Sequence, residues 1–271
     1  MNKYRSLSKL FSLKNRVIVI TGATGLLGTE FAHILSDAGA NIVLVGQSKI
    51  DKNKKLVSEL RKKYNTNPTS YNIDITKKHE VGQLKNDVYE KYERIDGLVN
   101  NAQFVPRKHP NRAAPFENYS LELWDQTLCT NLTGPFLCSQ EIGKIMSMRQ
   151  NGVIVNVSSI YGMVGTDHRI YGKSRLNSPP SYAATKGAVI SLTRYLAAYW
   201  HRKNIRVNSL TLGGVFHNQN KRFVTKYSEK TMLGRMANKE EYNGALLFLL
   251  SDASSYMTGA NLVVDGGWTA W

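Results

Sequence analysis

The sequence is poor in cysteine and has no long hydrophobic run. Its two cysteines, Cys129 and Cys138, lie nine positions apart in one expected helix, too far along it to form a disulfide. This excludes a disulfide-stapled fold and favours a reducing compartment. The longest apolar run, Ala245 to Leu250, cannot span a bilayer, and residues 1–16 lack the apolar core of a signal peptide. We therefore expect a cytoplasmic protein without a membrane partner.

Acidic residues are also scarce. The chain has 20 Asp and Glu against 36 Lys and Arg, which gives a formal net charge of +16. This surplus admits nucleic acid, an anionic surface or an anionic small molecule as a partner. The basic residues are scattered, with no basic tail and no alternation with aromatic residues, so we expect no nucleic-acid partner. His168 and His217 have no spaced carboxylate or thiol cluster beside them, so no metal site is expected.

A glycine-rich turn follows the first apolar segment. Val17 to Ile20 is a continuous β-branched run, typical of a buried parallel strand, and a helix is expected from Thr29 to Ala38. Between them Gly22 permits a tight bend, Gly25 lets the backbone approach a phosphate, and Gly28 allows close packing of the helix on the strand. Such turns also occur as ordinary strand-to-helix connections. Here the turn predicts a site for a dinucleotide pyrophosphate.

The alternation of strand and helix continues to the end of the chain. We expect further strands at Asn41–Val45, Ser70–Ile73, Ile95–Val99, Gly152–Val157, Ile205–Leu210 and Asn261–Val264, and helices at Leu56–Tyr64, Val81–Tyr92, Leu121–Met148, Gly187–Trp200 and Glu240–Leu250. Alternating units with right-handed crossovers predict an α/β fold, a single doubly wound Rossmann domain with a seven-stranded parallel sheet. With 42% hydrophobic residues the chain can bury one large core. We assign residues 14–271 to this domain and residues 1–13 to an N-terminal extension.

The end of the second strand bears on the choice of cofactor. An acid there accepts a hydrogen bond from an adenosine 2′-hydroxyl, whereas a basic residue suits a 2′-phosphate. This chain has Gly46, Gln47, Ser48 and Lys49 and no acid, so NADP(H) is favoured slightly over NAD(H). Asp74, after the third strand, is placed to accept a hydrogen bond from an adenine amine, although acids at strand ends are often merely solvated.

A tyrosine and a lysine stand one helical turn apart at the start of the helix that leads into residues 187–200. Tyr182 and Lys186 lie four positions apart, so their side chains should project from the same face. An adjacent cation lowers the pKa of a phenol, and such a tyrosine can exchange a proton with an alcohol or a carbonyl. The spacing alone also fits a helix-start tyrosine with a solvated lysine. Asn131 is unusual as well, since an asparagine in mid-helix costs stability.

Seven motifs in order carry a resemblance to a known family. They are TGATGLLG, NNAQ, Asn131, VSSIYG, YAATK, NIRVNSL and the terminal VVDGG. In order and spacing the chain resembles the short-chain dehydrogenase/reductase family, in its shorter, non-extended branch. More narrowly it is similar to oxidoreductases of bacterial surface-sugar and flagellin-modification pathways. The resemblance implies an NAD(P)-dependent oxidoreductase that interconverts a secondary alcohol and a ketone, and a homodimer or homotetramer.

The resemblance also implies site residues. The catalytic tetrad falls on Asn131, Ser159, Tyr182 and Lys186, with Tyr182 as the acid/base, Ser159 holding the substrate oxygen and Asn131 organising a relay water. Lys186 lowers the tyrosine pKa and binds the nicotinamide ribose. The implied cofactor contacts are Gly22, Thr24, Gly25, Leu27, Gly28, Gln47, Ser48, Lys49, Asp74, Ile75, Asn101, Ala102, Tyr182, Lys186, Gly213 and Val215.

Four positions depart from the family pattern. Leu26 stands where the shorter branch has glycine, Gln103 replaces the glycine after NNA, Leu212-Gly213 replaces Pro-Gly, and His217 lies where a threonine often contacts the cofactor. These departures put loop geometry and nicotinamide contacts in question and leave the tetrad untouched.

Two inserts, residues 163–181 and 212–235, are expected to lie over the active site. Their charged residues, and those of residues 107–112, could line the cleft with cations and draw in a phosphorylated or acidic sugar; a generally basic surface is the alternative. The residues concerned are Arg107, Lys108, His109, Arg112, Asp167, His168, Arg169, Lys173, Arg175, Lys221, Arg222 and Lys226. The predicted substrate is therefore a sugar-like or anionic small molecule. The alternative function is a catalytically silent nucleotide-binding regulatory or scaffold protein of the same fold.

Overall fold

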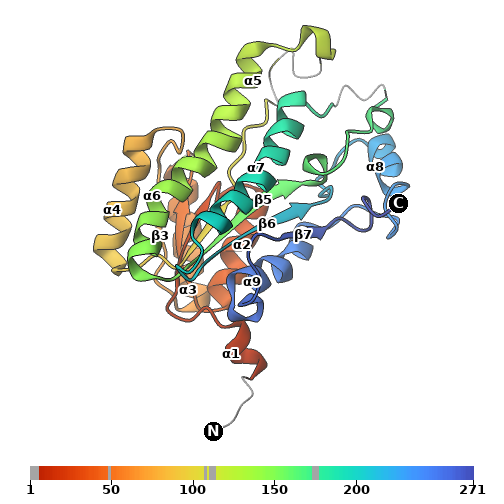
Figure 1. The fold of residues 1–271 in the computed structure, drawn as a ribbon. Coiled ribbons are helices and arrows are strands. Elements are labelled where there is room, and N and C mark those ends of the chain that lie inside the picture. The colour runs from red at the N-terminus through yellow and green to blue at the C-terminus, as the bar shows by residue number, and fades with distance from the viewer. Residues whose placement is uncertain (1–5, 48–49, 107–108, 110–113, 173–176) are drawn as a thin grey trace.

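The computed structural model describes residues 6–47, 50–106, 109, 114–172 and 177–271 and contains a seven-stranded parallel sheet (Figure 1). The strand order is β3-β2-β1-β4-β5-β6-β7. The chain starts in the middle of the sheet, works outward to β3, returns to β4 beside β1 and then works outward to β7. This reversal is the doubly wound topology expected from the sequence, and it confirms the predicted fold class. The strands are β1 Val17–Thr21, β2 Asn41–Val45, β3 Thr69–Tyr71, β4 Gly97–Asn100, β5 Gly152–Ser159, β6 Ile205–Leu212 and β7 Asn261–Val264.

Strand ends differ from the prediction where pairing sets them. The edge strand β3 ends at Tyr71 and not at Ile73, because its partner β2 ends at Val45, opposite Tyr71. β5 and β6 run to Ser159 and Leu212, further than predicted, because they pair with each other along eight successive residues. The predicted catalytic serine, Ser159, is therefore the last residue of β5, at the carboxyl ends of the two longest strands.

Helices cover both faces of the sheet. On one face α2, α3 and α9 pack against side chains such as Ile18 and Ile20, and on the other α4, α6 and α7 pack against Val17 and Val19. Alternate residues of β1 thus enter two separate cores, as expected for a strand buried on both faces. The helices are α1 Leu7–Phe11, α2 Leu26–Asp37, α3 Ile50–Tyr64, α4 Lys78–Tyr92, α5 Leu121–Leu128, α6 Gly134–Arg149, α7 Pro180–Tyr199, α8 Lys221–Ser228 and α9 Asn243–Leu250.

The helix predicted over Leu121–Met148 is interrupted. A single π-helical turn, η3 Cys129–Thr133, separates α5 from α6, and Gly134 N donates to Cys129 O in the i→i+5 pattern. Pro135 lies in the first turn of α6 and has no N–H, so it cannot make the α-helical bond to Asn131 O. The interruption therefore falls at the asparagine that the sequence singled out.

Further helical segments differ in extent from the prediction. α3 begins at Ile50 and not at Leu56. The residues just before Leu56 are polar and break the apolar pattern, so the pattern did not indicate that they belong to the helix. The predicted helix Glu240–Leu250 starts as the 3₁₀ turn η6 Lys239–Tyr242 before α9. α8 was not predicted at all; Figure 1 shows it beyond the carboxyl ends of β5 and β6. The remaining 3₁₀ turns are η2 Phe116–Asn118, η4 Ile160–Gly162, η5 His168–Ile170 and η7 Asp252–Ser254.

A third, smaller apolar cluster forms outside the two cores. It joins the turn after β5, the insert 163–181, α8 and the C-terminal segment through Ile160, Ile170, Phe223, Tyr227, Met236 and Trp268.

At the other end of the chain Leu13 is fully buried in the α2–α9 core, so packing of the domain begins inside the predicted extension. Cys129 is exposed, Cys138 is buried, and both are free thiols. Among the described helices none has the length and apolar character that a membrane span requires.

Candidate active site

The glycine-rich turn between β1 and α2 is held in a shape that only glycine allows. Gly22 has φ +65°, and a Cβ there would lie 2.8 Å from the Ala102 Cα. A Cβ on Gly28 would lie 2.2 Å from Gly22 O. The Asn101 amide nitrogen donates to Thr21 O at 3.0 Å and to Gly22 O at 3.2 Å. The end of β4 thus fixes the turn from the side.

A cleft of about 830 Å³ opens over this turn. α2 starts there at Gly25 without a side-chain cap, so its first N–H groups and its positive dipole end are available to an anion. The size, the glycine cradle and the helix start all fit a dinucleotide with its pyrophosphate on α2. Of the expected cofactor residues, those that line the cleft are Gly22, Thr24, Gly25, Leu27, Gly28, Gln47, Ile75, Asn101, Ala102 and Val215.

The remaining cofactor residues are placed differently. Ser48 and Lys49 lie outside the described residues. Asp74 is not among the cleft-lining residues; its carboxylate accepts from Thr76 N at 2.9 Å and from Thr76 Oγ1 at 2.7 Å. Burial opposes its ionisation, but the bonds from Thr76 and from the Gln47 side chain outweigh this and lower the pKa of Asp74. Asp74 therefore orients the amide at the end of β2.

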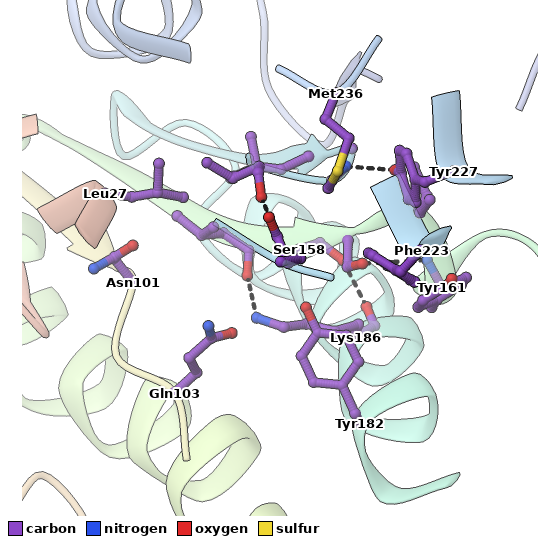
Figure 2. A pocket seen from close by; sticks show the side chains of 18 of the residues that line it. Leu27, Asn101, Gln103, Ser158, Tyr161, Tyr182, Lys186, Phe223, Tyr227 and Met236 are labelled. Carbon is purple, nitrogen blue, oxygen red and sulfur yellow. Dashed lines mark hydrogen bonds between the residues drawn. The ribbon is translucent and has the colours of Figure 1, made fainter. Parts of the chain in front are cut away.

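A second cavity of about 250 Å³ contains the predicted tyrosine and lysine. Tyr182, Lys186, Ser159 and Gly213 all line it. It adjoins the larger cleft, because the two share Leu27, Asn101, Gln103, Val215 and Gln219 as lining residues. Figure 2 shows Leu27 and Gln103 on the side of this cavity opposite Tyr227. Tyr182 thus lines a cavity that adjoins the cleft of the glycine-rich turn, and the departure Gln103 stands at the border of the two.

Tyr182 and Lys186 share one face of α7, as their spacing predicted. The Lys186 Nζ lies 5.6 Å from the centre of the Tyr182 ring and donates to Val157 O at 2.9 Å (Figure 2). Lys186 is 4% exposed, and burial lowers its pKa to about 8. Burial raises the pKa of Tyr182, and a hydrogen bond from Ser159 offsets this only in part. The structure thus does not show the expected lowering of the tyrosine pKa, because desolvation of the half-buried Tyr182 outweighs the bond from Ser159.

The two serines after Val157 have different partners. Ser158 Oγ donates to the Lys186 backbone carbonyl at 2.9 Å, which ties β5 to α7. Ser159 caps η4 by accepting from Tyr161 N at 3.3 Å. Of the two serines, Ser159 is the one that lowers the pKa of the Tyr182 phenol. Ser159 as the catalytic serine stays a prediction.

Asn131 lies in the π turn and is 2% exposed. Its Oδ1 accepts from Phe104 N at 2.6 Å, and its Nδ2 donates to Phe104 O at 3.5 Å. The side chain therefore holds the segment that follows Asn101–Ala102, and it lines neither cavity, whereas the neighbouring Thr130 lines the cleft. In the structure Asn131 thus supports residues 101–104, and its place in a catalytic tetrad stays a prediction.

The sequence reading missed an aromatic wall. Tyr161, Tyr171, Phe223 and Tyr227 line the smaller cavity opposite the glycine-rich turn. Phe223 stacks on Tyr171 with ring centres 5.4 Å apart, and the hydroxyls of Tyr161 and Tyr171 lie 2.9 Å apart. Burial raises the pKa of Tyr161, which keeps this phenol neutral. The one available signal was the four-residue spacing of Phe223 and Tyr227 in a polar stretch, the period of one helix face.

The cations expected at the mouth are largely paired with other groups where they are described. Asp167 accepts from Arg169 at 2.9 Å and from Lys230 at 2.8 Å, which holds its pKa well below the usual range. Lys226 Nζ donates to Arg169 O at 3.0 Å. Neither Lys221 nor Arg222 lines a cavity, and Arg107, Lys108, Arg112, Lys173 and Arg175 lie outside the described residues. Residues of both inserts line the two cavities: Tyr171, Asn177 and Pro179, and then Leu212, Gly213, Gly214, Val215, His217, Gln219, Phe223 and Tyr227.

The arrangement brings a neutral phenol, a serine hydroxyl and a buried lysine to the border of a dinucleotide-sized cleft. Such a set can hold an oxygen atom and deliver or remove its proton while a cofactor in the cleft reacts at the attached carbon. Over the described residues no group of three or more His, Cys, Asp or Glu is placed to hold a metal ion.

Comparison with known proteins shows the family of this chain. A family model described as enoyl-(acyl carrier protein) reductase matches residues 22–269. The chain belongs to the short-chain dehydrogenase/reductase family, and it is an NAD(P)-dependent oxidoreductase of CH–OH groups.

Three similar proteins illustrate the range of the family. Post-translational flagellin modification protein A from Campylobacter coli is 34% identical, over 94% of this chain and 99% of its own. A gluconate 5-dehydrogenase from Burkholderia cenocepacia, solved with NADP and tartrate, is 28% identical with a TM-score of 0.85, over 98% and 100% of the two chains. A short-chain dehydrogenase from Leptospira borgpetersenii with bound NAD⁺ is 31% identical with a TM-score of 0.83, over 99% and 98%.

Proposed function

We propose that this chain interconverts a secondary alcohol and a ketone on a sugar-like small molecule, with Tyr182 as the acid/base. The observation that carries the proposal is the placement of Tyr182, Ser159 and Lys186 in a cavity that shares a border with the dinucleotide-sized cleft. The bound nicotinamide supplies or accepts the hydride. In reduction the Tyr182 hydroxyl gives its proton to the substrate oxygen, which becomes the alcohol, and in oxidation the same oxygen returns its proton to the phenolate.

Ser159 and Lys186 support the proton transfer. The Ser159 hydroxyl lies beside the phenol and can hold the substrate oxygen there by a hydrogen bond. The Lys186 ammonium stabilises the phenolate once the proton has left, and its bond to Val157 O keeps it under the ring. Because burial lowers the pKa of Lys186 to about 8, most of the side chain is in the ammonium form at neutral pH. The population of the ammonium form falls as the pH rises above 8. Asn131 contributes by positioning residues 101–104.

The aromatic wall supports a sugar-like substrate. The rings of Tyr171 and Phe223 offer apolar faces for the CH groups of a polyol or sugar, while the Tyr161 hydroxyl and the Gln103 amide can bond its hydroxyls. The gluconate dehydrogenase relative points to the same class. An acidic or phosphorylated sugar remains within the proposal, and the panel below separates it from neutral polyols.

We propose NADP(H) over NAD(H) as the preferred cofactor. Gln47 lines the cleft at the end of β2, where an acid would repel a 2′-phosphate, and the chain has none in that turn. Relatives are known with either nicotinamide bound, so the preference depends on this turn. Calorimetric titration with each nicotinamide measures it directly.

The decisive experiment measures turnover with both nicotinamides on neutral polyols, sugar acids, sugar phosphates and simple ketones. Tyr182→Phe should lower kcat/KM on any accepted substrate by about 10²–10⁴-fold, the usual contribution of a general acid or base. Tyr256→Phe, at a fully exposed tyrosine outside α6 and α7, is the matched control and should change little. Unchanged turnover in Tyr182→Phe would remove the mechanism, and tight cofactor binding without turnover on the whole panel would favour the silent scaffold.

We also propose a homodimer or homotetramer formed through the long helices. Phe136 on α6 and Tyr195 and Tyr199 on α7 are 44%, 64% and 66% exposed, which is high for large side chains on otherwise packed helices. Light scattering after size exclusion tests this, and a monomer at micromolar concentration would contradict it.

A further inference from the structure

The peptide between Gly213 and Gly214 lies where the segment after β6 reaches both cavities. Gly213 and Gly214 line the smaller cavity, and the next residue, Val215, lines both. The sequence has Leu212-Gly213-Gly214 here, so no proline stiffens the backbone. Two successive glycines leave this segment the widest choice of backbone conformation. Backbone bonds hold the segment on either side, from Gly213 N to Val264 O and from Ala237 N to Gly214 O, and side chains hold the 213–214 peptide group itself.

Two tyrosines bond the two ends of this one peptide group. Tyr242 Oη donates to Gly213 O at 3.0 Å, and Gly214 N donates to Tyr227 Oη at 2.5 Å (Figure 2 labels Tyr227). Tyr242 comes from η6 and is fully buried, while Tyr227 comes from α8 and is 3% exposed. The carbonyl and the N–H belong to the same plane, so the pair of hydroxyls prevents the peptide from rotating.

Neighbouring atoms leave no room for a side chain on either glycine of this peptide. A Cβ on Gly213 would lie 2.8 Å from the Asp265 Cα, and one on Gly214 would lie 2.5 Å from the Tyr227 ring. Tyr227 is itself fixed by stacking on Trp268, with ring centres 4.3 Å apart. The Tyr227 hydroxyl thus links the orientation of the peptide to the positions of α8 and of the C-terminal segment.

α8 also contributes a residue to the aromatic wall. Phe223, one turn before Tyr227, stacks on Tyr171 and forms part of the aromatic wall. A single helix therefore contributes both a wall of the substrate cavity and the acceptor for the Gly214 N–H. Displacement of α8 would shift the wall and release the peptide next to Val215 together.

We propose that Tyr227 is a positioning residue that sets cofactor affinity by holding the 213–214 peptide, and with it Val215, at the border of the two cavities. The inference rests on the proposed function only in taking the larger cleft as the cofactor site. Without the Tyr227 hydroxyl the half-buried Gly214 N–H lacks its acceptor, and the peptide turns toward another one as far as the flanking backbone bonds allow. Val215 then moves into or away from the cofactor cleft.

The test compares hydroxyl deletions that keep every ring. Tyr227→Phe should raise the Kd for the preferred nicotinamide, measured by titration calorimetry, about fivefold or more. Tyr242→Phe removes the other bond of the same peptide from outside the cavity and should act in the same direction. Tyr171→Phe removes a hydroxyl from the same aromatic wall without touching the peptide and should leave this Kd within about twofold.

The outcomes separate positioning from stability and from a failure of the proposed function. Thermal unfolding of each variant shows whether it is folded at the titration temperature. Folded Tyr227→Phe and Tyr242→Phe proteins with the wild-type Kd overturn the inference, as does an equal rise in Tyr171→Phe. A wild type that binds neither nicotinamide overturns the proposed function first. Wild-type binding without turnover leaves the Kd comparison fully informative.

Discussion

The Lys186 ammonium nitrogen lies 5.6 Å from the centre of the Tyr182 ring, one turn further along α7, and both side chains face the smaller cavity. Burial lowers the lysine pKa and raises the tyrosine pKa. Desolvation thus favours the neutral form of each group. The pair is held ready for proton exchange at a cost in stability, and that cost can be measured.

The first prediction concerns the pH dependence of folding. The pKa of Lys186 is 10.5 in an unfolded chain and about 8 when folded, so below pH 8 the buried ammonium destabilises the fold. Between pH 8 and 10.5 only the folded protein has lost the proton, and its stability rises with pH. Across this window the free energy of unfolding of the wild type should rise by roughly 3 kcal/mol relative to that of Lys186→Met, since one pKa unit is worth about 1.4 kcal/mol. Urea unfolding at pH 7, 9 and 10 tests this; a constant difference would contradict it.

The second prediction concerns the bond between Asn131 and Phe104. Asn131→Ala leaves the Phe104 N–H without the acceptor now 2.6 Å away, which should cost about 1–3 kcal/mol of unfolding free energy. Cofactor affinity should fall as well, because Phe104 follows the cleft residues Asn101 and Ala102. The exposed Asn151→Ala should change stability by no more than about 0.5 kcal/mol. Equal effects of the two changes, measured by urea unfolding, would argue against a specific role.

The third prediction uses two glycines in helices. Gly28→Ala puts a methyl group 2.2 Å from Gly22 O, so the turn must open and affinity for either nicotinamide should drop at least tenfold. Gly82→Ala in α4 meets nothing within 4 Å and should stabilise the protein by about 0.5–1 kcal/mol through the helix preference of alanine. Calorimetric titration and thermal unfolding of both variants provide the readouts. Undiminished binding in Gly28→Ala would mean that the cofactor does not use this turn.

The fourth prediction concerns cofactor choice. Gln47→Asp places a carboxylate at the end of β2, where it can accept from a ribose 2′-hydroxyl and repel a 2′-phosphate. The ratio of NADP⁺ to NAD⁺ affinity should fall at least tenfold, while Gln47→Asn, which keeps a neutral amide, should stay near wild type. If both nicotinamides weaken in parallel, Gln47 does not discriminate between them.

Sequence reasoning succeeded where local pattern and tertiary structure agree. The apolar run of β1 and the glycines after it specify a buried strand and a tight turn by themselves, and the Tyr182–Lys186 spacing fixes a shared helix face. α8 was missed because Lys221, Arg222 and Lys226 mask the two aromatic residues that bury it. The Asn131–Phe104 bond and the two bonds to the 213–214 peptide join distant segments, and no local period records such contacts.

The pKa of Tyr182 was predicted to be lowered and is raised, also because of contacts that the sequence does not record. A sequence shows which charge stands one turn from a phenol, but the hydration lost by that phenol depends on everything packed above it. Residues from β5, η4 and the insert line the cavity together with Tyr182. Burial raises the pKa of Tyr182 by more than the bond from Ser159 lowers it.

The π turn at Cys129–Thr133 has a consequence for the alignment of related chains. Five residues there cover the arc that an α-helix covers with fewer, so the apolar pattern of α6 is offset by one residue from that of α5. Deleting one residue of the turn would give an unbroken α-helix over the same arc, so Leu123 and Thr127 would stay in the packed interface while the bulge at Asn131 would be lost. Homologues that keep this asparagine should therefore keep all five residues of the turn.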